Sequence, residues 1–539
     1  MRRWNGWGDS TTSYPLPENA LEILENWVGP ATPPRDVTFT QAITAVPESR
    51  LPAHPLISQE GADRLRHARG QSLPDLIALR SGRIGQFPDG VAFPNDDEAV
   101  ADLIQFAGQH GFRLIPYGGG TSVVGHINPE PGETPVITIN LQRLNRLRHF
   151  DETSQLATFG AGVQGPDLEA QLRARGYTLG HFPQSFELST LGGWVATRSS
   201  GQQSLGYGRI ENLFAGGTLY APAGKLILPP FPASAAGPDI RQAVLGSEGR
   251  LGIITEVIVR VSPLPERDDV HAIFFPDFDA GWEAVRRIAQ ARLPLSMMRL
   301  STARETQTTL ALAGRHKLTN ALDKLLSLRG VREGKCMLLV GFTGRKNVTK
   351  TGRKAALAIA GQHKGVHVGR QFGKQWQKGR FRAPYLRNSL WEAGYAVDTL
   401  ETAAPWSGIP GMINGIETAL TEAAAGFNER IHVFTHLSHV YPTGASVYTT
   451  YLFRLAADPD ETLERWRLLK TAASRAIVAG QGTISHQHGV GVDHAPYLAA
   501  EKGELGIAAI ADLTRRFDPR GIMNPGKLIG ERLSVNGYR

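Results

Sequence analysis

Three consecutive glycines after a predicted strand are the residues best suited to bind an anion. Gly118, Gly119 and Gly120 follow the strand predicted at 113–116, and Thr121 and Ser122 come directly after them. Glycine lets a ligand approach the backbone closely, and neighbouring amides can form an anion-binding nest. The spacing is that of neither a Rossmann loop nor a Walker loop. The loop favours contact with a pyrophosphate, and a plain turn is the simpler alternative.

Two further loops carry the same small residues. One covers residues 181–201 and includes Ser-Thr-Leu-Gly-Gly, and the other covers residues 246–256 and begins Gly-Ser-Glu-Gly. Each lies at the end of a predicted strand or helix. The three loops together predict a surface lined with small hydrogen-bond donors, which strengthens the pyrophosphate hypothesis.

Histidines and a tyrosine near the end of the chain form a second set that could do chemistry. Tyr448 lies in Val-Tyr-Thr-Thr-Tyr, His486 and His488 lie in Ser-His-Gln-His-Gly, and His436 and His439 precede them. Such side chains can move protons. The four histidines could also converge on a metal, but histidine pairs are more often structural, and we predict no metal. A strand tyrosine and a turn histidine are the simpler alternatives.

The order of predicted elements determines where these residues lie. A strand at 91–94, a helix at 96–107 and strands at 113–116 and 136–140 predict an α/β layer that ends in the glycine loop. A second block runs from a strand at 156–163 to a strand at 251–261, and two prolines then mark a boundary. Residues 265–455 alternate strand and helix, and the remainder is largely helical.

Composition limits the class of protein. The chain has 539 residues, of which 41% are hydrophobic, and one cysteine, Cys336, in an apolar run that predicts a buried strand. One cysteine excludes an intrachain disulfide and a thiolate metal cage. We find no apolar signal segment and no stretch long enough to span a membrane, so we expect a cytoplasmic protein.

The net charge of +8 comes from one segment. Residues 335–387 contain thirteen Lys and Arg and no Asp or Glu. Such a segment could contact a phosphorylated substrate or an anionic membrane surface, and a solvated face is the simpler alternative. Aromatic residues are sparse there and no nucleic-acid motif is present, so we predict no nucleic-acid partner.

Together the three loops resemble the FAD-binding flavoproteins of the vanillyl-alcohol oxidase type. The resemblance covers about residues 89–261 and includes the closing Asn-Pro-Gly-Lys at 524–527. It implies non-covalent FAD, because relatives that bind flavin covalently carry a histidine in the first loop, where this chain has Gly120. The implied FAD contacts are Pro116, Tyr117, Gly118, Gly119, Gly120, Thr121, Ser122, Gln184, Ser185, Ser189, Thr190, Thr197, Arg198, Ser199, Ser200, Glu248, Gly249, Leu251, Gly252, Ile253 and Ile254.

This resemblance implies an α+β fold in which a two-part FAD-binding domain is joined to an α/β cap. The domains predicted are an N-terminal arm with helices at 1–85, the FAD-binding domain at 86–264, a substrate-binding cap at 265–455, and a largely helical segment at 456–539 that returns to the flavin.

Outside the FAD loops the chain resembles the alkyldihydroxyacetonephosphate synthases, the ether-lipid enzymes of this group. Trp-Asn-Gly-Trp-Gly at 4–8 and Leu-Glu-Thr-Ala-Ala-Pro-Trp at 400–406 carry the resemblance. It implies exchange of the acyl group of acyl-dihydroxyacetone phosphate for a fatty alcohol, without net oxidation. It implies Tyr448 as the proton acceptor, His486 and His488 as groups that set its proton affinity, and Arg299 near the flavin and the substrate.

Two positions depart from that family. Its central histidine is Gln487 here, and its substrate-binding arginine aligns with His436. The alternative reaction is that of an FAD-linked 2-hydroxy-acid dehydrogenase or oxidase, of the D-lactate or glycolate type, although the carboxylate before His488 that such enzymes carry is absent. A flavin-binding protein without catalysis is a third alternative. We expect an anionic small-molecule or lipid substrate, peripheral membrane contact through residues 335–387 and a homodimer.

Overall fold

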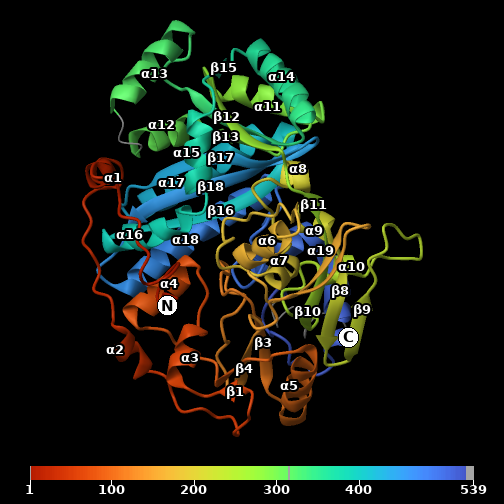
Figure 1. Cartoon of the computed structure of the whole chain (residues 1–539). Coiled ribbons are helices and arrows are strands. Elements are labelled where there is room, and N and C mark those ends of the chain that lie inside the picture. Colours follow the sequence, from red (N-terminus) through yellow and green to blue (C-terminus); the bar gives the residue numbers. More distant parts are fainter. Residues whose placement is uncertain (1, 313–315, 530–539) are drawn as a thin grey trace.

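The computed structural model describes residues 2–312 and 316–529. A seven-stranded sheet with its covering helices lies at one end of the molecule, and two smaller sheets lie at the other (Figure 1). The N-terminal segment, red in Figure 1, runs along the side of both parts. This is the α+β architecture that the sequence predicts.

The first sheet ends in the glycine loop. Its strands β2 (Gly90–Ala92) and β3 (Arg113–Tyr117) run parallel to β4 (Val136–Asn140), and β1 (Ile57–Ser58) is antiparallel to β2. The connecting helix α5 (Asp97–His110) begins at the cap Asp96, whose carboxylate accepts a hydrogen bond from the amide of Ala99 at 2.8 Å. It ends at Gly111, which has a left-handed φ of 72°. The predicted α/β layer is confirmed.

The second sheet is antiparallel and carries the other two loops. Its strand order is β5-β6-β10-β8-β9. Helices α6 (Gly165–Arg173) and α7 (Leu191–Thr197) bury Leu172 and Trp194 in its core. The remaining elements of this part are β5 (Leu147–Asp151), β6 (Leu156–Gly160), β7 (Tyr177–Thr178), β8 (Phe214–Ala221), β9 (Gly224–Leu228), β10 (Ile253–Arg260), β11 (Ser262–Pro263), α8 (Ser204–Tyr207), α9 (Ile210–Leu213) and α10 (Arg241–Val244).

The cap is a seven-stranded antiparallel sheet of order β15-β12-β14-β13-β17-β18-β16. Cys336 begins β14 and is fully buried, which confirms the structural role that its apolar neighbours predict. The strands are β12 (Arg267–Phe275), β13 (Met297–Ser301), β14 (Cys336–Gly344), β15 (Val366–His367), β16 (Tyr395–Pro405), β17 (His432–Tyr441) and β18 (Gly444–Arg454). The helices are α11 (Phe278–Gln290), α12 (Ala303–Leu312), α13 (His316–Leu328), α14 (Lys346–Gln362), α15 (Gln371–Gly379), α16 (Leu386–Glu392) and α17 (Ile409–Gly426).

The terminal segments bind the two parts together. The long helix α18 (Pro459–Ala479) contacts α4 (Leu73–Ser81), which belongs to the N-terminal segment. The other elements of these segments are α1 (Ala20–Val28), α2 (Phe39–Ile43), α3 (Gly61–Arg66), α19 (Leu498–Phe517) and the 3-10 turn η3 (Ala495–Tyr497), while the 3-10 turns η1 (Ala383–Tyr385) and η2 (Trp406–Gly408) lie in the cap. Within the described ranges, no helix combines the length and the apolar character of a membrane span.

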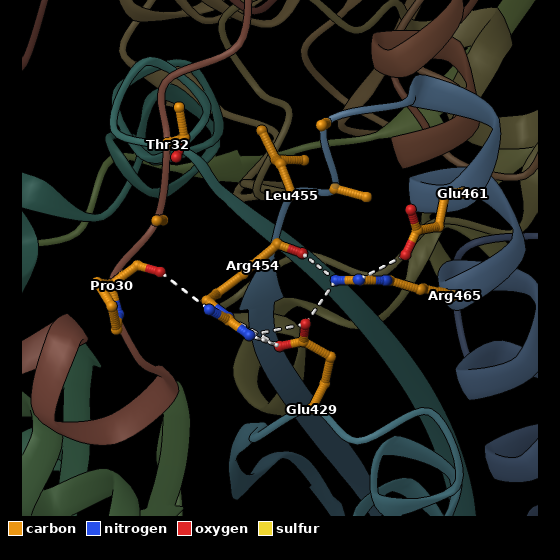
Figure 2. Close-up of a pocket in the computed structure, with 10 residues that line it drawn as sticks. Pro30, Thr32, Glu429, Arg454, Leu455, Glu461 and Arg465 are labelled. Carbon is orange, nitrogen blue, oxygen red and sulfur yellow. Dashed lines mark hydrogen bonds and ion pairs between the residues drawn. The ribbon is translucent and has the colours of Figure 1, made fainter.

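A surface pocket marks one place where the N-terminal segment meets the cap (Figure 2). Arg454 donates to the carbonyl oxygen of Pro30 at 3.1 Å, and both Arg454 and Arg465 pair with Glu429, at 2.8 and 2.9 Å. Arg465 also pairs with Glu461 at 2.6 Å, so two arginines and two glutamates neutralise one another, and the pocket offers little to a charged ligand.

Candidate active site

The glycine loop packs directly on the second loop. A β-carbon on Gly119 would collide with the backbone of Leu188, and one on Gly118 would collide with the side chain of Thr190. Only glycine permits this approach. Thr190 also caps α7, and its hydroxyl accepts a hydrogen bond from the amide of Gly193. Two of the predicted FAD segments are therefore in contact.

The third loop joins them from the other side. A β-carbon on Gly249 would lie 3.0 Å from the ring of Pro116. The carboxylate of Glu248 accepts hydrogen bonds from the amides of Val490 and Gly491, at 2.5 and 2.8 Å. The side chain of Glu248 therefore anchors the C-terminal segment, and its backbone is bonded within the protein as well, since its amide donates to the carbonyl oxygen of Ala196 at 3.0 Å and its carbonyl oxygen accepts from Asn524 at 2.7 Å.

Of the other predicted cofactor residues, Ser189 forms a hydrogen bond within the FAD-binding part, and Gln184 and Ser200 contact residues of the cap. Ser189 accepts a hydrogen bond from the indole nitrogen of Trp194 at 2.7 Å, and Gln184 donates to the carbonyl oxygen of Arg380 at 2.6 Å. Ser200 contacts Nδ1 of His439 at 3.2 Å. The FAD segments thus meet the cap at two points, and the roles predicted for these residues toward FAD remain predictions.

We expect that Gly119→Ala abolishes FAD retention. The new methyl group would overlap the backbone of residue 188, which cannot rotate away as a side chain can. Flavin absorbance of the purified variant measures the effect. Gly361→Ala is the matched control, because a β-carbon there meets no atom within 4 Å, and it should purify with full flavin. Equal flavin content in the two variants would contradict the prediction.

Tyr448 lies on β18, the cap strand between β17 and the edge strand β16. It pairs with Glu401 on β16 and with His436 on β17, so that the three side chains share one face. The ring of Tyr448 stacks on His436 with centroids 4.9 Å apart and meets His488 edge-on at 6.0 Å. The structure therefore brings together three of the residues for which catalytic roles are predicted.

Arg299 lies on the His436 side of this group. Its guanidinium donates to Glu305 at 2.5 Å and contacts Nδ1 of His436 at 3.2 Å. Glu305 is also 3.0 Å from that same nitrogen. A buried carboxylate thus holds Arg299 beside His436, and it offsets part of the positive charge.

Glu401 organises the other side. Its carboxylate accepts hydrogen bonds from Ser438 at 2.7 Å and from the amide of Gln487 at 2.6 Å, and it lies 3.1 Å from Nδ1 of His486. The Gln487 amide cannot carry a proton as a histidine can, but it is a hydrogen-bond donor to Glu401. His439 and His488 each lie 4.0 Å from the same carboxylate.

A β-bulge in β17 makes this convergence possible. The register slips by one residue between Leu437 and Val440, opposite Ala445 and Val447 of β18. In a regular strand, residues 436 and 439 would face opposite sides. The extra residue lets His436 and His439 serve the same side of the sheet.

His486 connects this group to the FAD segments. Its Nε2 lies 2.6 Å from the hydroxyl of Tyr441 and 2.6 Å from the guanidinium of Arg209. Arg209 also donates to the carbonyl oxygen of Arg198 at 3.0 Å. A continuous path of polar contacts therefore runs from the cap to the second FAD loop through Glu401, His486, Tyr441 and Arg209. Tyr448 is not part of this path.

Burial sets the proton affinities of the site. It raises the pKa of Tyr448 to about 12 and lowers the pKa of His488 to about 4 and that of His439 to about 3. Burial alone would raise the pKa of Glu401, but His486, by its charge and hydrogen bond, holds it well below the usual range. At neutral pH the site holds a neutral phenol, neutral His439 and His488, and an ionised Glu401.

The structure has consequences for stability at acidic pH. Burial lowers the pKa of His181, His439, His488 and His494 to about 3 or 4, against 6.5 for a free histidine. Between these values the unfolded chain binds protons that the folded protein does not. Stability is then complete above pH 6.5 and falls as the pH drops toward 4, by up to about 1.4 kcal/mol per pH unit for each histidine.

We therefore expect the melting temperature to fall between pH 7.5 and pH 5, and to fall less steeply in His488→Asn. Thermal unfolding followed by circular dichroism across that range measures both slopes. A melting temperature that does not change with pH would contradict the assigned burial of neutral histidines.

Four residues of the site carry no role in the sequence interpretation. Glu401 lies within the motif at 400–406, but the neighbouring sequence does not show that it pairs with Tyr448 on the adjacent strand. Glu305, Arg209 and Tyr441 lie in unremarkable sequence. A strand pairing for residues 395–405 and 444–454 would have revealed Glu401.

Three of the buried groups could also ligate a cation. Ligand atoms of Glu401, His439 and His486 all lie within 4.8 Å of one another. His436 is apart from them, beside Glu305. The four histidines considered from the sequence thus separate into two groups, and the prediction of no metal stays a prediction.

Comparison with known proteins places this geometry in a family. The model of the FAD binding domain matches residues 88–228, and that of the FAD linked oxidases, C-terminal domain, matches residues 264–528. Alkyldihydroxyacetonephosphate synthase of Dictyostelium discoideum is 32% identical over 86% of this chain and 77% of its own length. The chain belongs to the alkyldihydroxyacetonephosphate synthase family.

Two further matches extend over nearly the whole chain. The synthase of Trypanosoma brucei brucei is 28% identical over 98% of this chain and 92% of its own. A solved alkyldihydroxyacetonephosphate synthase superposes with a TM-score of 0.83 at 26% identity, covering 98% of this chain and 99% of that one. The protein is an FAD-dependent enzyme of this family, and the cofactor expected from the three loops is confirmed.

The loops fit that cofactor. Gly118, Gly119 and Gly120 carry no side chains, so the glycine loop packs tightly on its neighbours, and consecutive backbone amides of this kind can form a nest for a phosphate group. The second loop supplies α7, whose N-terminus begins at Thr190 beside Gly118. Backbone amides and hydroxyl groups can donate hydrogen bonds to the phosphates of a dinucleotide, and apolar residues can contact its rings.

Proposed function

We propose that the enzyme exchanges the acyl group of an acyl-dihydroxyacetone phosphate for a fatty alcohol. The bond from the substrate carbon to the carboxylate oxygen breaks, a bond from that carbon to the alcohol oxygen forms, and a fatty acid leaves. The position of Tyr448 between Glu401 and His436, on the cap face that meets the FAD segments, carries this proposal. The match to synthases over nearly the whole chain supports it.

FAD, when bound, supplies the electron-poor ring at which the exchange takes place. The chain's own part is proton transfer and orientation. Tyr448 passes its phenolic proton to neutral His488, whose ring meets the tyrosine ring edge-on, and the phenolate so formed takes the proton from the carbon beside the ketone. Because the pKa of Tyr448 is raised to about 12, the phenol needs such a neighbour to act near neutral pH.

The anionic group of the substrate requires positive charge. Arg299 contacts His436, which in turn stacks on the Tyr448 ring, and Glu305 holds the guanidinium in place. We propose Arg299 as the group that orients the phosphate or the ketone oxygen. His436 then separates Arg299 from Tyr448 without adding a charge of its own, because burial and, to a lesser extent, the charge of Arg299 lower the pKa of His436.

The test is the anaerobic flavin spectrum together with product analysis. Acyl-dihydroxyacetone phosphate with a fatty alcohol should release fatty acid while the oxidised flavin is regenerated at each turnover. Rapid bleaching by D-lactate or glycolate without fatty acid release would overturn the proposal in favour of the dehydrogenase. Gln487, which stands where dehydrogenases carry a carboxylate, argues against that outcome.

We also propose that the basic stretch docks on anionic lipid. In α14, Lys350 and Lys354 are exposed, and Val348 beside them exposes 43% of its surface. Other charges of the stretch are used internally, since Arg370 pairs with Asp269 at 2.8 Å. Sedimentation with phosphatidylserine vesicles should be strong at low salt and lost at high salt. Equal binding to neutral vesicles would contradict an electrostatic contact.

A further inference from the structure

The N-terminal arm brings a cation to the glycine loop. Within residues 2–9, Arg2 and Asp9 pair as an isolated antiparallel bridge, and the amide of Arg3 donates to the carbonyl oxygen of Gly8 at 2.9 Å. Nη2 of Arg2 lies 2.9 Å from the point that a β-carbon on Gly120 would occupy. The guanidinium therefore lies against the loop that receives the cofactor.

This turn is fixed to the rest of the molecule. Asn388 of the cap bonds both the backbone amide and the carbonyl oxygen of Trp7, at 3.1 and 2.9 Å. Arg80 of α4 donates to the carbonyl oxygen of Asn5 at 3.0 Å. Trp7 is itself buried. The position of Arg2 is thus set by tertiary contacts on two sides, which lowers the entropy lost when the guanidinium binds a ligand.

The loop itself offers a diphosphate no cationic side chain. Residues 116–125 contain no Lys or Arg. Backbone amides supply dipoles, whereas a guanidinium adds a full charge and a planar fork that matches two phosphate oxygens. Arg3 is directed to the cap, where it pairs with Glu392 at 3.7 Å. Arg2 forms no ion pair within residues 2–312 and 316–529, so its charge is available to a ligand.

We propose that Arg2 binds the diphosphate of FAD. The arm is then part of the cofactor site, and it supplies the cation that the glycine loop does not contain. A contact of Arg2 with the flavin ring is the competing arrangement, and the experiment below distinguishes the two.

The test compares Arg2→Gln with Arg3→Gln in protein freed of flavin. Flavin fluorescence quenching gives the Kd for FAD and for riboflavin, and ADP competing with FAD reports the diphosphate without the flavin ring. We expect Arg2→Gln to weaken FAD and ADP by about tenfold or more, with riboflavin unchanged and with Arg2→Lys in between. Arg3→Gln should stay within about twofold of the wild type.

Three results would overturn the proposal. Equal losses in both variants would show that the arm acts through the fold, and melting curves of the proteins would accompany that comparison. A loss of riboflavin affinity equal to that of FAD would place Arg2 at the ring. Unchanged FAD and ADP affinity in Arg2→Gln would remove it from the site.

Discussion

Replacing Tyr448 by phenylalanine is expected to lower kcat by about 10²- to 10⁴-fold while FAD stays bound. The phenol is the group placed between Glu401 and His436 on the cap face that meets the FAD segments. The substitution removes the hydroxyl and keeps the ring that stacks on His436 at 4.9 Å, so the cap should fold normally. Fatty acid release in single-turnover experiments measures the chemical step.

Tyr451→Phe is the matched control for this experiment. Tyr451 belongs to the same strand, but its side chain lies on the other face, where its hydroxyl donates to Asp398 at 3.2 Å. Its loss should cost about 1 kcal/mol of stability and leave kcat within about threefold. If the two variants lose activity equally, Tyr448 has no special part in proton transfer.

The second large effect is expected for Glu401→Gln. Ser438, Gln487 and His486 all approach this carboxylate, and a glutamine would turn its own amide toward at least one of these groups. An unsatisfied buried donor costs about 1–3 kcal/mol. Since His486 and His488 would also lose the charge that orients them, we expect kcat to fall by about tenfold or more. Urea unfolding and steady-state kinetics measure the two effects.

Glu211→Gln provides the comparison. Glu211 pairs with Arg209 at 2.9 Å, at the other end of the polar path, and it is half-buried. Loss of such a partly exposed pair is worth less than about 1 kcal/mol. A result in which Glu401→Gln is as mild as Glu211→Gln would mean that Glu401 does not organise the histidines.

The cofactor site could be predicted from the sequence because its signals are local. Three glycines after a strand, and Ser, Thr and Gly at helix starts, express backbone requirements that neighbouring residues reveal. The contacts between the three loops agree with this prediction, since Gly119 packs on Leu188 and Gly249 packs on Pro116. The family resemblance supplied the name of the cofactor, which composition and spacing alone leave open.

The catalytic group could be predicted only in part because its geometry is not local. Tyr448 and His436 are found from their motifs, but their contact depends on strand register. The bulge in β17 changes which side His439 faces, and a single inserted residue gives no clear pattern in the sequence. The sequence shows Gln487 only as a departure from the family resemblance, whereas the structure shows that its amide donates to Glu401.

The charge pattern of residues 335–387 shows the same limit. A run without acidic residues suggests one continuous basic face. In the structure Lys335 pairs with Asp323 at 3.3 Å and Arg387 pairs with Asp398 at 3.2 Å, while Arg380 lies over the ring of Phe182. Partners outside the run divide it into paired and exposed charges, so the proposed docking surface is smaller than the sequence suggests.

The contact of His439 with Ser200 joins two parts of the chain that are 239 residues apart. Closing so long a loop is entropically slow relative to forming the sheets on either side of it. During refolding the FAD-binding part can therefore reach its native contacts before the cap docks on it. Refolding protein is expected to take up its yellow colour first and to regain turnover later, and stopped-flow flavin fluorescence followed by timed assays would resolve the interval.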